Sequence, residues 1–282
     1  MKIALTGAAG VLSREIASQL ADRDVELRLT DVLPMDDAGG HDFIQADLAV
    51  AEQARAAVDG VDVVIHVAAI HPWKEYTSDQ YLDCNVKAVH HVLQACVDAG
   101  VPRVIYTSSI AAAGYNRDVD ELPLTEHIDR RPNDLYGASK AMGETLCETF
   151  SRTHGLHVIS LRPPCFIPTD ETDPSYGVRL LSTHGHVTDV AQAHVKALDR
   201  PDLRCDAFWC TSAHPFTRED VQELQDAPRS VYARHFREAE EFIMSRPELE
   251  APLGLIYDLS RAREKLGYTP KTGFASWFAA NA

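Results

Sequence analysis

A tyrosine and a lysine stand four positions apart in "DLYGASKAMGE" (134–144), as Tyr136 and Lys140. Four positions are about one helical turn, so both side chains would leave the same face of a helix. A free phenol has a pKa of ~10, and a neighbouring ammonium favours its deprotonated form. The pair could therefore exchange a proton with a substrate hydroxyl near neutral pH. The alternative is a half-buried helix edge with a solvated lysine, and the rest of the chain must decide between the two.

A short glycine-containing loop near the start of the chain has the composition of a dinucleotide site. "LTGAAGVLSRE" (5–15) follows a strand-like run and opens a helix-like one. Gly7 permits a tight turn, and Gly10 lets the backbone approach a pyrophosphate at the positive helix N-terminus. Ser13, a small residue, stands where a third glycine is usual. Such a loop alone is weak evidence, because similar loops also occur for structural reasons.

Two carboxylates strengthen this interpretation. Asp31 ends the second strand-like run, where it could hydrogen-bond the adenosine ribose diol. Its charge would repel a 2′-phosphate, which favours NAD over NADP. Asp47, which ends "DFIQAD" (42–47), and Leu48 lie near the expected position of an adenine edge, although Asp47 could instead cap a helix. Together these residues predict an NAD-binding protein.

Apolar runs rich in β-branched residues alternate with amphipathic, helix-like stretches along most of the chain. This alternation indicates a parallel sheet with helices on both faces, an α/β doubly wound fold of the Rossmann type. After residue 213, charged helical sequence predicts a small, mostly helical lobe. We expect an NAD-binding domain over 1–162, continued by 186–212, and a substrate-binding lobe made of 163–185 and 213–282. The expected strands are 2–7, 25–31, 62–69, 103–109, 157–163 and 207–212, and the expected helices are 11–22, 50–58, 79–99, 136–154 and 188–199.

The charge of the chain argues against polyanionic partners. Its 27 basic and 42 acidic residues give a formal net charge of −15, and such a surface repels nucleic acid and anionic membrane. The six cysteines form no C-x-x-C pair, as expected of reduced thiols. No signal-like segment precedes the first strand, and no apolar run approaches the roughly 18 residues of a membrane span. We therefore expect a cytoplasmic protein that acts on a small molecule.

In this order, the motifs resemble those of the extended short-chain dehydrogenase/reductase family, also called the NAD-dependent epimerase/dehydratase family. The likeness extends over nearly the whole chain, and the Y-x-x-x-K helix in company with the other motifs is highly specific. The residues that carry it are the glycine loop, Asp31, Asp47-Leu48, "HVAA" (66–69), Asn85 in "NVKAVHHVLQAC", "YTSS" (106–109), "TEHIDRRPNDLYGASK" (125–140), "LRPP" (161–164) and "DLSRAREKLGYTP" (258–270).

The resemblance implies a catalytic trio of Ser109, Tyr136 and Lys140. Ser109 is selected over Ser108 because Gly114 lies five residues beyond it, as in the family. Asn85 would support the proton path through hydrogen bonds, or would simply be a polar residue on a core helix. The residues expected to contact NAD are Gly7, Gly10, Val11, Leu12, Asp31, Asp47, Leu48, Val67, Ala68, Ala69, Asn85, Thr107, Tyr136, Lys140 and Pro163.

Within the family, the chain most resembles the uronate dehydrogenases, with which it shares an R-x-L-S-T run, here Arg179 to Thr183. By that likeness Arg179 would bind a substrate carboxylate, or it would pair with an acidic residue of the preceding loop. Two departures indicate different recognition groups. Ile110-Ala111 replaces polar residues after the catalytic serine, and His71 replaces a serine after the fourth strand. The residues expected to contact substrate are His71, Trp73, Ser109, Ile110 and Arg179.

Three functions are compatible with these residues. A dehydrogenase would consume NAD while oxidising or reducing a secondary hydroxyl or hemiacetal of a small, non-nucleotide sugar or sugar acid, with Tyr136 as proton acceptor or donor. An epimerase acting on a nucleotide sugar or small sugar would retain NAD, and an NAD-sensing module would do no chemistry. Ile110-Ala111 argues against a dehydratase. Only 26 residues separate Arg162 from Asp189, which leaves little wall for a nucleotide diphosphate, so the dehydrogenase is our hypothesis.

Two further expectations concern partners. The family counterparts of helices 79–99 and 136–154 pair across a two-fold axis, so the resemblance implies a homodimer. No metal site is expected, because His184 and His186 in "THGH" have no third ligand nearby in the sequence.

Overall fold

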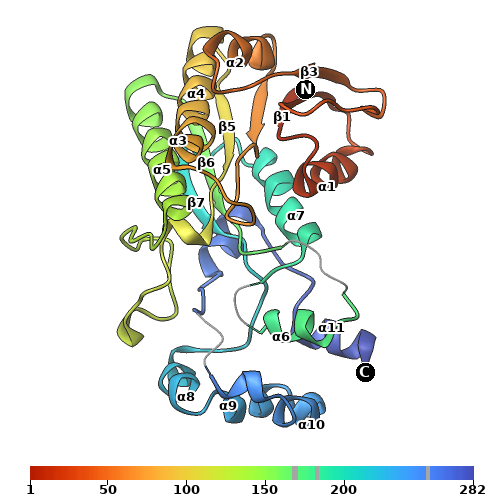
Figure 1. Cartoon of the computed structure of the whole chain (residues 1–282), viewed down its shortest axis with the longest axis vertical. Helices are drawn as coiled ribbons and strands as arrows, with labels where there is room; N and C mark the ends of the chain where they lie inside the picture. Colours follow the sequence, from red (N-terminus) through yellow and green to blue (C-terminus); the bar gives the residue numbers. More distant parts are fainter. Residues whose placement is uncertain (167–170, 182–183, 252–254) are drawn as a thin grey trace.

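The computed structural model describes residues 1–166, 171–181, 184–251 and 255–282. Within these residues the strands form one seven-stranded parallel sheet in the order β3-β2-β1-β4-β5-β6-β7 (Figure 1). The winding reverses between β1 and β4, and doubly wound sheets bind ligands at the carboxyl ends of such strands. The predicted fold class is confirmed. The strands are β1 (Lys2–Thr6), β2 (Glu26–Asp31), β3 (Asp42–Gln45), β4 (Val63–His66), β5 (Arg103–Thr107), β6 (His157–Arg162) and β7 (Cys205–Trp209).

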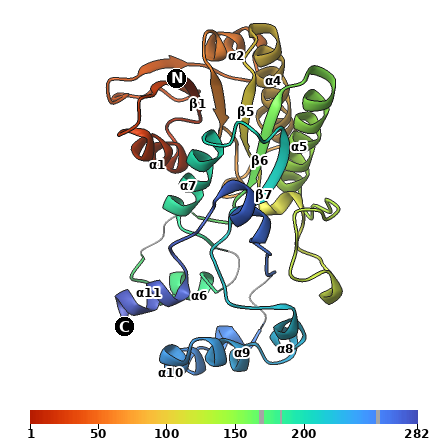
Figure 2. The same ribbon diagram turned by 180° about the vertical axis from the view of Figure 1, so that it is seen from behind.

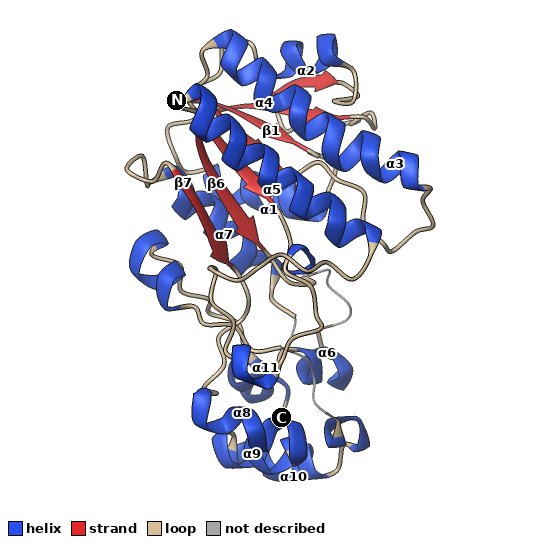
Figure 3. Ribbon diagram, turned by 90° about the vertical axis from the view of Figure 1, so that its left-hand side faces the viewer, coloured by secondary structure: helices blue, strands red, loops and turns tan. Residues whose placement is uncertain are grey.

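Helices cover both faces of the sheet, which explains why the central strands β4 and β5 are buried along their whole length. On one face α1 (Val11–Leu20) packs against α7 (Val187–Leu198) (Figure 2). On the other face α4 (Ala88–Ala99) packs between α2 (Ala51–Val58) and α5 (Leu135–His154) (Figure 3). Each layer has its own apolar core against the sheet.

The predicted helix 79–99 is interrupted. α3 (Ser78–Leu82) begins at Thr77, whose side chain accepts from the backbone of Gln80 in a capping box. A π-helical segment, η1 (Asp83–Lys87), then leads into α4. Such π turns often lie at functional sites, and this one contains Asn85, whose side chain is buried.

The last strand also differs from the prediction of 207–212. β7 spans Cys205–Trp209 and pairs with β6 up to Arg162. Pro163 and Pro164 follow Arg162, and proline has no backbone N–H to continue a ladder. Cys210 to Ser212 therefore continue as irregular chain, in which the Ser212 hydroxyl donates to the carbonyl of His184 at 2.7 Å.

Below the carboxyl ends of the strands lies a mostly helical lobe (Figure 1). Aromatic side chains fill it, with Phe274 in contact with Phe236, Phe242 and Trp277. Its α-helices are α6 (Pro174–Arg179), α8 (Val221–Asp226), α9 (Pro228–His235), α10 (Glu240–Met244) and α11 (Phe274–Asn281), and its short helical turns are η4 (Arg218–Asp220), η5 (Arg237–Ala239) and η6 (Pro247–Glu250). The π-helical η7 (Ala262–Leu266) packs instead against α7 and β7.

The loop after β5 begins with η2 (Ile110–Ala112), continues to η3 (Val119–Glu121), and depends on Gly114. Gly114 has φ +84°, and a Cβ there would lie 1.8 Å from the carbonyl oxygen of Arg131. Gly155, which ends α5, has φ +73° but open space where a methyl group would lie. The two glycines therefore share a backbone requirement and differ in available space.

We expect Gly114→Ala to lower the free energy of unfolding by about 2–5 kcal/mol, because left-handed strain and a backbone clash add. Gly155→Ala, the matched control, should cost only about 1–2 kcal/mol from the backbone conformation. Urea denaturation followed by circular dichroism measures both. Equal losses would contradict the role assigned to the Arg131 contact.

Candidate functional site

Ser109 and Tyr136 meet at the carboxyl end of β5. Asp134 caps α5 by accepting from the backbone N–H of Gly137 at 2.6 Å, so Tyr136 lies in the first turn. The absence of a side chain at Gly137 lets α5 approach η2, since a Cβ there would lie 2.5 Å from the Ala111 carbonyl. Ser109 reaches the Tyr136 phenol with its hydroxyl in a hydrogen bond. The structure thus brings the predicted serine and tyrosine into contact.

The adjacent Ser108 has a different environment. Its hydroxyl donates to Glu144 at 2.7 Å, and Glu144 also accepts two hydrogen bonds from the Arg162 guanidinium at 2.8 and 2.9 Å and one from Arg130 at 3.1 Å. Burial alone would raise the pKa of Glu144, but Arg162 outweighs this and holds that pKa below its ordinary value. This buried network ties α5 to β6. Sequence reasoning missed it, although Glu144 stands one further turn beyond Lys140.

Lys140 is a buried cation without a carboxylate ion-pair partner among the described residues. Its Nζ donates to the Thr107 carbonyl at 2.8 Å and lies 5.9 Å from the centre of the Tyr136 ring. Burial lowers the pKa of Lys140 to about 8. One of its three donors is used, which leaves two for the hydroxyls of a ribose.

The expected lowering of the Tyr136 pKa by Lys140 is not found in the chain alone. Burial raises the pKa of Tyr136 above its ordinary value, and the hydrogen bond with Ser109 opposes that rise. Desolvation penalises a lone phenolate and a lone ammonium alike. A phenolate beside the ammonium would relieve both penalties, so the two groups favour charge only as a pair.

The glycine loop lies where β1 and β4 end. Gly7 has φ +66°, and a Cβ there would lie 2.9 Å from the backbone of Ala68, so only glycine fits. The Thr6 hydroxyl oxygen accepts from the backbone N–H groups of Val67 and Ala68 at 3.1 and 3.2 Å. Ser13 lies in close helix–strand packing as predicted, and donates to the Thr6 carbonyl at 3.1 Å. Thr6, which precedes the first glycine, is a structural determinant that sequence reasoning missed.

These residues fit a dinucleotide. α1 starts after Gly10 without a side-chain cap among the described residues, so its first backbone N–H groups remain available to a pyrophosphate. Val11 is exposed at this terminus, whereas Leu12 is buried under it. Asp31 is held by backbone donors of Ala9 and Leu33, both at 2.9 Å. A carboxylate is therefore fixed at the end of β2, on the side of the loop.

Other residues expected at the cofactor hold the surrounding loops. Asp47 does not cap α2, whose N-cap is Val50; it is exposed and accepts from the backbone of Ala49 in a local turn. Its neighbour Leu48 is buried. The Thr107 hydroxyl bonds to His194 at 2.8 Å, and the Pro163 carbonyl accepts from Ile110 N–H at 3.0 Å. Val67, Ala68 and Ala69 are partly exposed after β4.

Asn85 acts on the loop after β4. Its Oδ1 accepts from the backbone N–H of Ile70 at 2.8 Å, and its Nδ2 donates to the Ile70 carbonyl and to the Ser139 hydroxyl, both at 3.0 Å. Ser139 in turn donates to the carbonyl of Tyr136 at 2.7 Å. Both amide hydrogens of Asn85 are thus used by protein groups, which supports the interpretation of this residue as part of the hydrogen-bonded frame of the site.

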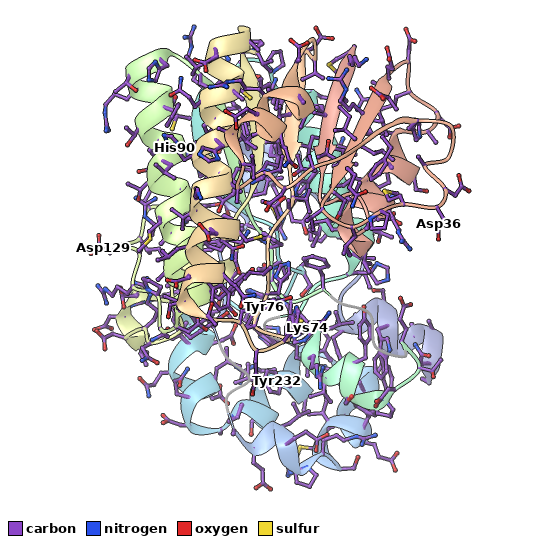
Figure 4. The ribbon with its side chains drawn as sticks, turned by 45° about the horizontal axis from the view of Figure 1, so that its top comes forward. Asp36, Lys74, Tyr76, His90, Asp129 and Tyr232 are labelled. Carbon is purple, nitrogen blue, oxygen red and sulfur yellow. The ribbon has the colours of Figure 1, made fainter. Side chains whose placement is uncertain are left out.

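Of the residues expected at the substrate, His71 and Ile110 lie beside Tyr136 and Ser109, whereas Trp73 and Arg179 are exposed. His71 Nδ1 lies 3.2 Å from the Tyr136 hydroxyl, and Ile110 is buried next to Ser109. Trp73 is 57% exposed, so it is not buried as a loop anchor. Lys74 and Tyr76 of the same loop lie between the sheet and the lobe in Figure 4, with Tyr232 on the lobe side.

Arg179 ends α6 and is exposed. Within the described residues its side chain forms no ion pair: Glu171 pairs with His186 at 2.8 Å, and Asp173 caps α6. Arg179 also interacts electrostatically with His184: burial lowers the pKa of His184 to about 4, and the charge of Arg179 contributes less to that shift. Asp170 and the Ser182-Thr183 part of the R-x-L-S-T run lie outside the described residues.

Comparison with known proteins gives a consistent result. The model of the NAD dependent epimerase/dehydratase family matches residues 3–173. The uronate dehydrogenase of Pseudomonas putida is 31% identical over 204 residues, 72% of this chain and 73% of that protein. The uronate dehydrogenase of Agrobacterium fabrum is 31% identical over 217 residues, 76% and 77% of the two chains.

Solved structures agree with these relatives. A mutant of the uronate dehydrogenase from Agrobacterium tumefaciens, complexed with NAD, superposes with a TM-score of 0.73 at 25% identity, over 99% of this chain and 88% of that one. A UDP-galactose 4-epimerase superposes with a TM-score of 0.72 at 20% identity, over 98% of this chain and 96% of that one. At that identity the second likeness concerns the fold alone. In the described residues, no helix is long and apolar enough to cross a membrane.

Cofactor choice follows from the Asp31 carboxylate. We expect NAD to bind at least about tenfold more tightly than NADP, about 1.4 kcal/mol, because Asp31 would repel a 2′-phosphate. Asp31→Asn keeps the shape of the side chain and removes its charge, so it should narrow the difference between the affinities for NAD and NADP. Asp36→Asn, which neutralises an exposed carboxylate of the following loop (Figure 4), should not. Isothermal titration calorimetry measures all three, and equal affinities in the unmodified protein would refute the assignment.

Proposed function

The chain belongs to the NAD dependent epimerase/dehydratase family, and from this premise we propose that it is an NAD-dependent dehydrogenase of a small, non-nucleotide sugar or sugar acid. The contact of Ser109 with Tyr136, one turn from buried Lys140, is the observation that carries this proposal. The reaction would interconvert a secondary hydroxyl or hemiacetal and a carbonyl group.

Each member of the trio has a separate task. Ser109 hydrogen-bonds the substrate oxygen and stabilises negative charge there. Tyr136 takes the hydroxyl proton during oxidation and returns it during reduction. Lys140 stabilises the phenolate, and its two remaining donors would hold the hydroxyls of the cofactor ribose. When bound, NAD would supply the hydride acceptor.

Several features support a small substrate. The segment between β6 and α7 is short, with 26 residues between Arg162 and Asp189. The residue after Ser109, Ile110, is apolar and buried, so it offers no polar group to a substrate. Arg179 is exposed and forms no ion pair within the described residues, and a guanidinium offers two parallel donors that match a carboxylate. The relatives named uronate dehydrogenase agree with an acidic sugar as substrate.

An epimerase that retains NAD is the second candidate, favoured by the presence of epimerases among proteins of the same fold. The two are separated by NADH release. Purified protein is incubated with NAD and a panel of uronic acids, aldoses and hydroxy acids. A dehydrogenase yields free NADH in step with oxidised product. NADH absorbance that stays with the protein, together with an inverted sugar, supports the epimerase instead.

The proposal extends to the organisation of the chain. Residues 1–162 and 186–212 would bind NAD, and 163–185 with 213–282 would bind substrate. α4 and α5 would pair with a second copy in a cytoplasmic homodimer, as the family resemblance implies.

The proton-transfer roles lead to a first prediction here. Tyr136→Phe should lower kcat by about a hundredfold or more while the protein still binds NAD. Lys140→Ala should lower kcat and also weaken NAD binding, because Lys140 has two tasks. Tyr257→Phe is the control, since it removes another buried hydroxyl, one without a hydrogen-bond partner among the described residues; its kcat should stay normal. Steady-state kinetics and calorimetry provide the data, and near-normal turnover by Tyr136→Phe would place the base elsewhere.

The second prediction concerns the charge of the substrate. Arg179→Ala should raise KM for an acidic sugar by about one to two orders of magnitude, from loss of a charged hydrogen bond of ~1.5–3 kcal/mol. KM for the matching neutral sugar and the affinity for NAD should not change. Arg263→Ala, which removes an exposed arginine of η7, is the control. An unchanged KM in Arg179→Ala, with neutral sugars preferred by the unmodified protein, would exclude a carboxylate contact.

A further inference from the structure

His71, on the loop after β4, contacts the phenol of Tyr136. Its Nδ1 is 3.2 Å from the Tyr136 hydroxyl, and the two ring centres are 5.4 Å apart at an interplanar angle of 45°. The hydroxyl of Tyr136 therefore has two protein neighbours, Ser109 and His71. An imidazole in contact with the phenol is a second group to which the Tyr136 proton could pass.

This contact is held from behind by a hydrogen-bonded frame. Asn85 fixes both backbone polar groups of Ile70, the residue that precedes His71. Asn85 also donates to Ser139, and Ser139 donates to the carbonyl of Tyr136. Ile70 and Tyr136 are in addition members of one small apolar cluster with Tyr81. The backbones that carry the imidazole and the phenol are thus joined through two side chains, which favours a lasting distance between the rings.

The imidazole is neutral at working pH. Burial lowers the pKa of His71 to about 4, with Lys140 as the second cause. The groups that face it are the Tyr136 phenol on α5, the Lys140 ammonium one turn further, and the Ile70 backbone held by Asn85; no carboxylate forms an ion pair with it among the described residues. A neutral imidazole has one donor and one acceptor. It can accept a proton at one nitrogen while it releases another from the opposite nitrogen.

The second ring nitrogen of His71, Nε2, belongs to a side chain that is partly exposed to solvent. Within the described residues Nε2 has no hydrogen-bond partner, whereas Nδ1 contacts the Tyr136 hydroxyl. By contrast, Nε2 of the neighbouring His66 is unpartnered and fully buried. Of these two histidines near Lys140, only His71 both contacts the Tyr136 hydroxyl and is partly exposed to solvent.

We propose that His71 is a further catalytic residue, which relays the proton of Tyr136 to solvent. The relay rests on the proposed dehydrogenase function. After Tyr136 has taken the substrate proton, its O–H bond breaks as an N–H bond forms at Nδ1 of His71. The Nε2–H bond breaks as that proton passes to water. One proton leaves per alcohol oxidised, and exchange with solvent restores the starting tautomer of the neutral ring.

Kinetics of two His71 variants test the relay. His71→Asn retains an amide near the place of Nδ1 and so keeps a hydrogen bond to Tyr136, but it cannot pass a proton on. We expect both His71→Asn and His71→Ala to lower kcat about ten- to a hundredfold, a part of what general acid–base groups contribute. KM should change less than about threefold, since a relay acts on turnover. A substrate-binding role would instead raise KM and leave kcat, which would overturn the proposal.

Rescue by added imidazole provides the decisive comparison. Free imidazole should restore kcat of His71→Ala at least about fivefold, because it can occupy the space of the lost ring and carry the proton. It should leave the unmodified protein and His90→Ala unchanged; His90 is an exposed histidine on α4 (Figure 4) whose ring contacts Phe150 of α5. Wild-type kcat in His71→Asn, or no rescue of His71→Ala, would overturn the relay.

A measurement without substrate separates this inference from the proposed function. In ¹⁵N NMR spectra of the full-length protein, with and without NAD, His71 should be a neutral ring with its proton on Nε2. Its Nδ1 resonance should shift in Tyr136→Phe, which removes the hydroxyl. An unmoved resonance refutes the contact and the relay, even if the protein is a dehydrogenase. If instead no sugar is oxidised while the resonance moves, the proposed function fails and the proton-transfer pair remains.

Discussion

The site depends on one buried charge. Lys140 lies below the carboxyl end of the sheet with a single hydrogen bond, to the carbonyl of Thr107, and without a carboxylate ion pair in the described part of the chain. Burial of a cation in this way costs free energy unless another group compensates. The compensation is partial: the ring of Tyr106 lies 5.3 Å from Nζ, and the pKa falls to about 8. A phenolate and a cofactor ribose are the groups that would complete it.

The titratable groups around Lys140 are either neutral or bound to other residues, so the ammonium of Lys140 is the main charge at the site. Burial, followed by Lys140, lowers the pKa of His66 to about 3 and that of His71 to about 4. Both imidazoles are therefore neutral, and neither repels the ammonium. The nearest carboxylate on the same helix, Glu144, is already bound by Arg162, Arg130 and Ser108. Glu144 thus fixes α5, and within the described residues it forms no ion pair with Lys140.

The loop after β4 is fixed by two pairs of hydrogen bonds from other parts of the chain. Asn85 holds Ile70 at both its backbone groups, and Thr6 holds the segment after β4 at Val67 and Ala68. The loop after β4 is therefore positioned on one side by the glycine loop and on the other by the π-helical turn. Such fixed loops keep the reacting groups at their distances before substrate arrives, which is how preorganisation lowers a barrier.

The sequence by itself determined the layered fold and the local parts of the site. Alternating buried runs and amphipathic stretches require a covered parallel sheet, and the four-residue spacing of Tyr136 and Lys140 requires a shared helix face, because both rules depend on neighbours in sequence. The turn at Gly7 and the carboxylate of Asp31 at a strand end were predicted for the same reason. The ends of the elements at the π-helical turn and at β7 could not be predicted from the sequence, since tertiary packing sets them.

Only the tertiary structure decided which groups meet. His71 and Tyr136 lie 65 positions apart, and nothing in their local sequences indicates that the rings touch. The structure distinguishes Ser108 from Ser109, because Ser108 donates to Glu144 whereas Ser109 interacts with Tyr136. The pKa of Tyr136 was expected to fall and is raised, because burial is a property of the folded chain and outweighs a charge that spacing alone would place nearby.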